Sequence, residues 1–124
     1  MPSSRAEAPL RDILHHIDLA AGFMAGLDYE AFADDLRTIY AVTRCLEIIS
    51  EASRRLSDDI KARHRGIAWK EMAGAGNVYR HDYEDVAARL LWETVHRELA
   101  PLRAVVVQEL GRLGPADRPP LLEP

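Results

Sequence analysis

The sequence contains a single cysteine, Cys45, and a lone cysteine cannot form a disulfide within its own chain. No apolar run approaches the roughly 20 residues that a membrane-spanning helix needs, and residues 1–9 lack the apolar centre of a signal peptide. Also missing are a glycine-rich phosphate loop, a zinc-spaced cysteine and histidine set, and a nucleophile elbow. These absences predict a cytoplasmic protein with no membrane attachment. They disfavour metalloenzymes and nucleotide-dependent enzymes, so no metal or cofactor is expected.

Aromatic residues are scarce as well. They make up only 6% of the 124 residues, with two Phe and two Trp, whereas hydrophobic residues together reach 48%. Ala, Leu, Arg and Glu are frequent, and alternating runs of Val, Ile or Thr are almost absent. This composition favours helices over a sheet. A chain of this length can bury one hydrophobic core, and a second domain does not fit.

Apolar residues recur at spacings of three and four along most of the chain, which is the period of helices packed into a bundle. We therefore expect an all-α fold, an antiparallel up-and-down four-helix bundle with a short extra C-terminal helix, over residues 9–113. A flexible tail (1–8) would precede it and a Pro-rich tail (114–124) would follow. Pro9 suits the first turn of a helix, and Pro101 is expected to end one. The predicted helices cover residues 9–25, 29–56, 57–65, 67–79, 83–100 and 102–113.

The net charge of −4 is unevenly distributed. Residues 54–81 carry seven Lys or Arg against three Asp or Glu, a local net charge of +4, so the remainder of the chain carries −8. A basic stretch of this kind is typical of a surface that binds nucleic-acid phosphates. A solvated connecting helix explains the same charge equally well.

Residues 74–83 concentrate the side chains best suited to chemistry: an amide, a guanidinium, an imidazole and two phenols. If one helix continues through them, Asn77 and His81 are four apart and share a face, so they could act on one substrate group as an acid/base pair. Gly74 and Gly76 each weaken a helix by about 1 kcal/mol relative to Ala, which suggests a close approach of a backbone, a ligand or a partner chain. The alternative is a helix–helix contact followed by a polar turn.

A second polar group lies earlier, where Tyr40, Arg44, Glu47 and Glu51 follow one another at spacings of four, three and four. Side chains at these spacings share one face of a helix. One interpretation is a solvated ladder of ion pairs, each worth a few tenths of a kcal/mol. The other is that Arg44, Glu47 or Glu51 supports the site by orienting His81.

Several segments, in order, resemble the HEPN superfamily and, within it, the HepT-like toxins, which are small all-helical ribonucleases of bacterial toxin–antitoxin pairs. The family's active-site motif is an Arg followed directly by Asn, then a His and, two residues later, a Tyr. Asn77, His81 and Tyr83 fall on that pattern, but Gly76 stands where the family has its Arg. The matching segments are Arg11–Ile17, Arg44–Ala52, Ile67–Lys70, Gly76–Tyr83 and Val86–Pro101.

The resemblance implies RNA cleavage without a metal. In the family the Arg holds the phosphate and the His moves protons while the RNA 2′-hydroxyl attacks the adjacent phosphorus. Losing one such preorganised donor costs several kcal/mol of transition-state stabilisation. Arg80, directly before His81, could supply the guanidinium from another direction. Otherwise Gly76 marks a degenerate HEPN binding module, which pairs with a nucleotidyltransferase and no longer cuts RNA.

The resemblance also implies partners: a second copy in a homodimer, an RNA substrate (tRNA or mRNA), and a minimal nucleotidyltransferase as antitoxin. That antitoxin would adenylylate Tyr83, adding charge and bulk where substrate phosphates must lie. Alternatively, Tyr83 is a helix-start aromatic that packs over Trp69 or Val86. Apolar residues in excess of one buried stripe support a dimer. They are Phe23, Met24 and Leu27 near the end of the first helix, and Leu90, Leu91 and Trp92 in the fourth.

Overall fold

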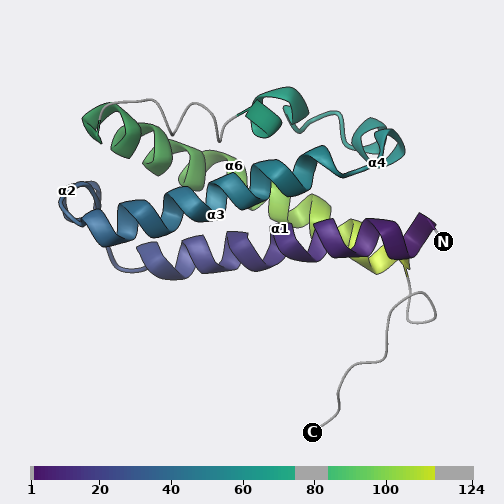
Figure 1. Ribbon diagram of the computed structural model, residues 1–124, viewed down its shortest axis with the longest axis horizontal. Helices are drawn as coiled ribbons and strands as arrows, with labels where there is room; N and C mark the ends of the chain where they lie inside the picture. Colours follow the sequence, from purple (N-terminus) through teal and green to yellow (C-terminus); the bar gives the residue numbers. More distant parts are fainter. Residues whose placement is uncertain (1, 75–83, 114–124) are drawn as a thin grey trace, which may run out of the picture.

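The protein is described by a computed structural model over residues 2–74 and 84–113 (Figure 1). Within these ranges every regular element is a helix and no strand occurs, which confirms the all-α fold class. None of these helices combines the length and apolarity needed to cross a bilayer. The elements are α1 (Pro2–Met24), α2 (Tyr29–Ala33), α3 (Leu36–Arg54), α4 (Asp58–Arg63) and α6 (Glu84–Leu113), with a further helical stretch over residues 69–74.

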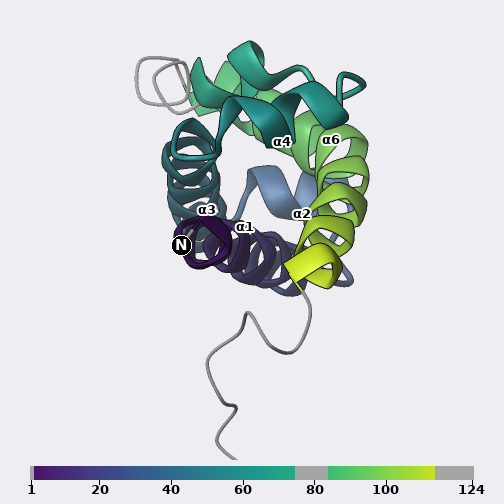
Figure 2. The same cartoon turned by 90° about the vertical axis from the view of Figure 1, so that its right-hand side faces the viewer.

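Three long helices form the body of the molecule. The helices α1 and α3 lie side by side and antiparallel, and α6 packs along α1 from the other side (Figures 1 and 2). The short helix α2 lies at one end of the bundle, and α4 lies at the other. Gly26, which has φ of 80°, ends α1 in the left-handed conformation that only glycine adopts without strain.

The core lies where the inner faces of these helices meet. On α1 the buried residues Leu10, Ile13 and Ile17 recur at spacings of three and four, as the sequence predicts. From the other elements, the following side chains are fully enclosed: Phe32 of α2, Val42, Leu46 and Ile49 of α3, and Leu91, Leu102 and Val106 of α6.

The first helix starts at Pro2 rather than at Pro9, so part of the expected N-terminal tail is helical. Pro9 lies inside α1, where it removes one backbone donor. The side chains of Glu7 and Pro9 are both buried, so this first part of α1 belongs to the packed body. Burial of this face outweighs the local preference of proline for a helix start.

The predicted helix over residues 29–56 is two helices, α2 and α3. Asp35 interrupts it because its carboxylate accepts a hydrogen bond from the Thr38 backbone N–H at 3.2 Å and caps α3. A second bond, from the Thr38 hydroxyl at 2.8 Å, fixes the same carboxylate. Leu36, the first residue of α3, is 47% exposed.

Pro101 does not end a helix, because α6 runs continuously through it to Leu113. Pro101 and Arg97 are both exposed, so water can solvate the Arg97 carbonyl that loses its helical donor. Leu99, Leu102 and Val106 follow one another at spacings of three and four across the proline and stay in the core. The expected separate C-terminal helix over residues 102–113 is therefore the second half of α6.

Candidate functional site

The residues assigned to chemistry fall into two groups. Asn77, Arg80, His81 and Tyr83 lie outside the described residues, as does Gly76. The supporting residues Arg44, Glu47 and Glu51 are described, and all three are on α3. The site is therefore built here from α3, from residues 69–74 that lead into the motif, and from α6 that follows it.

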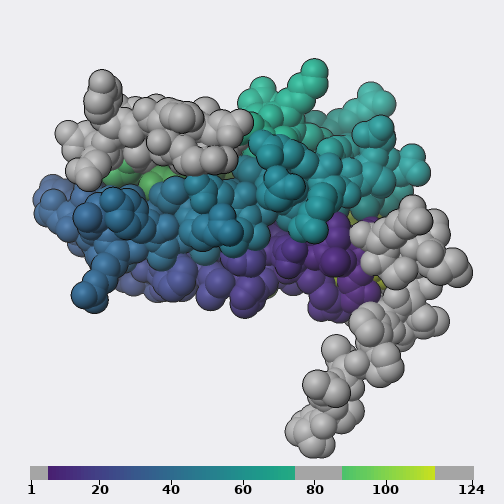
Figure 3. Space-filling view, in the orientation of Figure 1, coloured from purple at the N-terminus to yellow at the C-terminus, as the bar shows by residue number. Residues whose placement is uncertain are grey.

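Two side chains of α3 hold the segment that leads into the motif. The Ser50 hydroxyl donates to the Met72 carbonyl at 2.7 Å, and the Arg54 guanidinium donates to the Ala73 carbonyl at 2.6 Å. Ser50 and Met72 are both buried. Space-filling shows α3 across the middle of one face, between α1 and residues 58–74 (Figure 3). The chain therefore reaches residue 74 fixed against the C-terminal end of α3.

The second polar group, which we call the polar line, consists of Tyr40, Arg44, Glu47 and Glu51, and its two acidic residues share this side of α3. Glu47 and Glu51 precede Ser50 and Arg54 by three residues each, which places the four side chains along one helical face. Glu51 forms an ion pair with Arg54 at 3.0 Å, and Glu47 forms one with Arg44 at 3.4 Å. Glu47 is only 21% exposed, whereas Arg44 is 71% exposed. The polar line can still be a ladder of ion pairs or a support for His81. Within its pair, Glu47 is better shielded from water than Arg44.

The helix α6 is anchored from Ala88 onward. Ala88 and Leu91 are in the core, and Trp92 packs against Phe32 of α2 with ring centroids 5.6 Å apart. The motif thus connects two fixed points, a segment bound to α3 and a helix packed on α2. Such anchored flanks provide the rigid support that a precise catalytic site needs.

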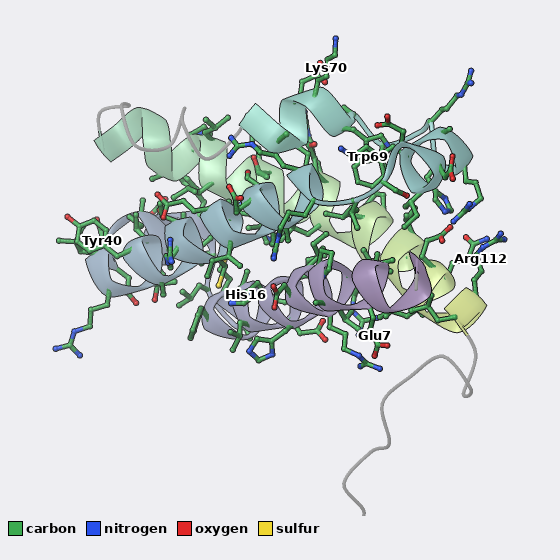
Figure 4. All side chains as sticks on the ribbon, turned by 45° about the vertical axis from the view of Figure 1, so that its right-hand side comes forward. Glu7, His16, Tyr40, Trp69, Lys70 and Arg112 are labelled. Atoms are coloured by element: carbon green, nitrogen blue, oxygen red, sulfur yellow. The ribbon has the colours of Figure 1, made fainter. Side chains whose placement is uncertain are left out.

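The basic stretch is partly neutralised in the folded protein. Arg54 pairs with Glu51 at 3.0 Å, and Arg55 reaches Asp12 of α1 at 3.0 Å. Arg63 pairs with Glu109 of α6 at 2.6 Å. Lys70 points away from the body (Figure 4). The positive surface available to an RNA is smaller than the local net charge indicates.

Trp69, at the entry to this segment, is a packing residue. Its indole N–H donates to the His64 carbonyl at 3.0 Å, and the ring is half-buried against the core. An indole fixed in this way closes the turn between α4 and residues 69–74.

One charged cluster, around Glu109, was not predicted from the sequence. The Glu109 side chain is only 3% exposed and accepts two hydrogen bonds from Arg63, at 2.6 and 3.1 Å. His64 lies 2.6 Å from its second oxygen. The Arg63 hydrogen bond is the main cause that holds the pKa of Glu109 below its usual value, against the opposing effect of burial. Because 45 residues separate His64 from Glu109, no local pattern could reveal the cluster.

The apolar residues expected at a dimer contact separate into buried and exposed ones. Met24 and Leu91 are in the core, and Leu27, Leu90 and Trp92 are partly buried against it. Phe23 remains 43% exposed, and α3 adds Leu36 at 47% and Tyr40 at 65%. Tyr40 marks one end of the molecule and Arg112 the other (Figure 4). Of the six expected residues Phe23 alone is exposed, so these residues offer a smaller apolar contact surface than predicted.

Within residues 2–74 and 84–113, no three His, Cys, Asp or Glu side chains are grouped so that they could hold a metal ion. These features define a small helical-bundle domain with a polar face on α3 beside the chain that leads into the Asn, His and Tyr motif. The family model described as "Ribonuclease HepT-like" matches residues 13–109. The protein belongs to this family, a branch of the HEPN superfamily.

Several relatives share most of the chain. A Thermococcus cleftensis protein named "Probable ribonuclease HepT" is 39% identical over 94 residues, covering 76% of this chain and 86% of its own. A Methanocaldococcus jannaschii protein, provisionally named an RNase, is 36% identical over 103 residues, covering 83% and 89%. A Caldanaerobacter subterraneus protein, also provisionally named an RNase, is 33% identical over 103 residues, covering 83% and 92%. No solved structure shows a significant match to the chain.

Proposed function

We propose that this protein is an endoribonuclease and the toxin of a toxin–antitoxin pair, acting in the cytoplasm without a metal or cofactor. The observation that carries the proposal is the match of residues 13–109 to a ribonuclease family, with Asn77, His81 and Tyr83 at motif spacing inside it. The names of the relatives support the nuclease class.

In the proposed reaction His81 takes the proton of an RNA 2′-hydroxyl, whose oxygen attacks the adjacent phosphorus. The bond to the 5′-oxygen breaks, and this oxygen receives a proton, which leaves a cyclic phosphate and a 5′-hydroxyl. Asn77 positions the phosphate or the imidazole. Arg80 supplies the guanidinium that stabilises the charge on the phosphate oxygens. Glu47 and Glu51, on the face of α3 that holds residues 72 and 73, support the site by orienting His81.

The test is cleavage of tRNA and mRNA by the purified protein, without its antitoxin, in the presence of a chelator. Wild type should cut and leave cyclic phosphate ends. His81→Ala should lose the activity while keeping the wild-type melting temperature. Arg103→Ala is a matched surface control, since Arg103 is exposed and pairs with Asp18 of α1. No cleavage by wild type, or full cleavage by His81→Ala, would refute the assignment.

A second candidate function is a binding module that no longer cuts RNA. Gly76 favours it, because the family's phosphate-binding Arg is missing at this position. The variant Gly76→Arg distinguishes the active ribonuclease from the inactive binding module. If wild type is inert and the restored variant cuts, the module is degenerate. If wild type already cuts and Arg80→Ala abolishes cleavage, Arg80 has taken over the charge.

The proposed antitoxin is a minimal nucleotidyltransferase that attaches AMP to the Tyr83 hydroxyl. The esterified ring would carry a phosphate charge and an adenosine beside the RNA site, so repulsion and steric block would act together. Incubation with that partner and ATP should raise the mass by one AMP unit in wild type and not in Tyr83→Phe. A Tyr83→Phe protein that is still modified and silenced would overturn this assignment.

We also propose a homodimer with two copies of the motif along a shared cleft. Its support is the exposed apolar set of Phe23, Leu36 and Tyr40. Light scattering at micromolar concentration should give twice the chain mass, and Tyr40→Glu should lower it. A monomeric wild type would contradict both the assembly and the shared cleft.

A further inference from the structure

Four side chains of α2 and α6 form an ordered stack at the surface. The guanidinium carbon of Arg89 lies 4.1 Å from the ring centroid of Tyr29. Tyr29 meets Trp92 edge to face at 5.6 Å, and Trp92 lies under His96 at 4.1 Å with 34° between the ring planes. Figure 2 shows α2 placed between α3 and α6, so that α2 lies against α6. Cation and rings thus follow one another along one surface.

The stack is partly solvent-facing. Arg89 and His96 are exposed, while Tyr29 and Trp92 are half-buried with their inner sides on the core. Arg89, Trp92 and His96 are spaced three and four along α6 and share one face of it. Arg89 and His96 are seven positions apart, about 10 Å along the helix axis. A short stretch of extended nucleic-acid backbone can bridge that distance.

Both ends of the stack are exposed to solvent. Among the side chains that the structure describes, no carboxylate pairs with Arg89, whose guanidinium carbon rests on Tyr29. The His96 ring is held in place, because its Nδ1–H donates to the Trp92 carbonyl at 2.8 Å. This bond leaves the outer face of the imidazole and its Nε2 toward solvent. A fixed ring on a packed indole is a prepared stacking platform.

We propose that Arg89, Tyr29, Trp92 and His96 form a subsite for an unpaired nucleotide of the RNA substrate, an inference that rests on the proposed ribonuclease function. The base stacks on the outer face of His96, above Trp92. The Arg89 guanidinium binds the neighbouring phosphate while its stacking on Tyr29 holds it in position. Bases within a duplex do not expose a face for stacking, so the subsite selects single-stranded segments or loops.

The position of the stack fits this role. It lies near the start of α6, and only three positions separate Glu84, where α6 begins, from His81 in the sequence. This closeness in sequence to His81 supports a role in binding the same substrate. Glu30 and Glu93 are also exposed on these two helices, so the local positive charge is small. Stacking, rather than counterion release, should dominate binding here, with a weak dependence on salt.

Trp92 supplies a direct probe of the subsite. In a Trp69→Phe, His81→Ala background, Trp92 is the only indole and the RNA stays intact. Titration with a short single-stranded oligoribonucleotide should quench the Trp92 fluorescence, and a duplex of the same sequence should not. His96→Ala and Arg89→Ala should each weaken binding of the single strand by about 5- to 100-fold. Duplex binding should change less than about twofold, since no stacking contact is lost.

Arg103→Ala is the matched control, since it removes one exposed guanidinium from α6 that pairs with Asp18 instead. Melting temperatures of all variants are compared first, and Arg89→Gln or His96→Asn, which also remove the cation or the ring, replaces an alanine variant that does not fold. His96→Phe keeps a stacking ring and should retain single-strand binding. If His96→Ala and Arg89→Ala bind and cut RNA like wild type, the subsite is refuted while the ribonuclease stands. If wild type neither binds nor cuts RNA, both proposals fail.

Discussion

The Ser50 hydroxyl of α3 donates a 2.7 Å hydrogen bond to the Met72 carbonyl, which lies 22 positions later in the chain. Arg54, one turn further along α3, bonds the Ala73 carbonyl at 2.6 Å. These bonds fix the segment that leads into the motif, whereas the other helix-to-helix contacts of α3 are mainly apolar. A cleavage site that begins a few residues later should depend on them.

Ser50→Ala should therefore lower both stability and activity. The Met72 carbonyl would lose its donor in a buried position, which costs about 1–3 kcal/mol. Residues 69–74 would also lose one of the two side-chain hydrogen bonds that Ser50 and Arg54 donate to them. Amide exchange in this segment should therefore accelerate more than elsewhere. Urea unfolding, hydrogen exchange and RNA cleavage measure the three effects.

Ser53→Ala is the control for this prediction. Ser53 is just as buried, but its hydroxyl bonds the Ser50 carbonyl within α3 at 2.7 Å. The variant loses a hydrogen bond of the same length without loosening residues 69–74. Equal losses of cleavage in both variants, after correction for the unfolded fraction, would show that the tie between α3 and Met72 has no special role.

The fold was largely predictable where one physical signal acts alone. The stripe of Leu10, Ile13 and Ile17 sets the buried face of α1, and Ser57 caps α4 by accepting from the Ile60 N–H. Both features depend on residues close in sequence. Local spacing and capping chemistry therefore sufficed.

Predictions failed where two signals compete. Asp35 breaks a helix whose apolar period continues through it, because capping outweighs continuity there. At Pro101 the outcome is the reverse, since burial of Leu99 and Leu102 outweighs one lost hydrogen bond. The relative strength of such terms depends on the packed structure, which the sequence pattern does not contain.

The candidate site, too, was predictable only where its residues are close together in the sequence. Glu47 and Glu51 could be placed on one helix face by counting residues, and the structure has them there. The bond from Ser50 to Met72 and the stack of Trp92 on α2 join residues far apart in sequence. Such contacts have no local signature, so the anchoring of the motif and the surface stack emerge only from the packed helices.

Glu109→Gln should destabilise the fold. The buried carboxylate holds both Arg63 and His64, and a neutral amide cannot balance the charge of Arg63 or accept all of the hydrogen bonds. Because Arg63 is 39% exposed, water can compensate in part, and we expect a loss of about 1–3 kcal/mol. Asp18→Asn, which breaks the exposed pair with Arg103, should cost much less. Urea unfolding at neutral pH compares the two, and equal losses would contradict the role of burial.

The same carboxylate should make stability sensitive to acid. The Arg63 hydrogen bond, with help from His64, keeps the pKa of Glu109 below its usual value in the folded state. Its stabilisation is therefore fully present above about pH 4.3, the value of an unperturbed Glu, and is lost as the pH falls through the folded pKa. Wild type should lose stability more steeply than Glu109→Gln between about pH 5 and pH 3. Parallel curves for the two proteins would exclude Glu109 as the source.

The polar line on α3 gives the last prediction. Glu47 is 21% exposed and shares the helix face of Ser50 and Arg54, whereas its neighbour Arg44 is 71% exposed. If Glu47 orients His81, Glu47→Gln should slow RNA cleavage and shift the pH–rate profile to lower pH, because losing a nearby negative charge disfavours the protonated imidazole. Arg44→Ala removes the other half of the 3.4 Å pair and should leave the profile in place. Cleavage rates for both variants from about pH 5 to pH 9, around the range in which an imidazole titrates, decide between positioning and a solvated ion pair. An unchanged profile in Glu47→Gln would assign the line to the solvent-exposed surface.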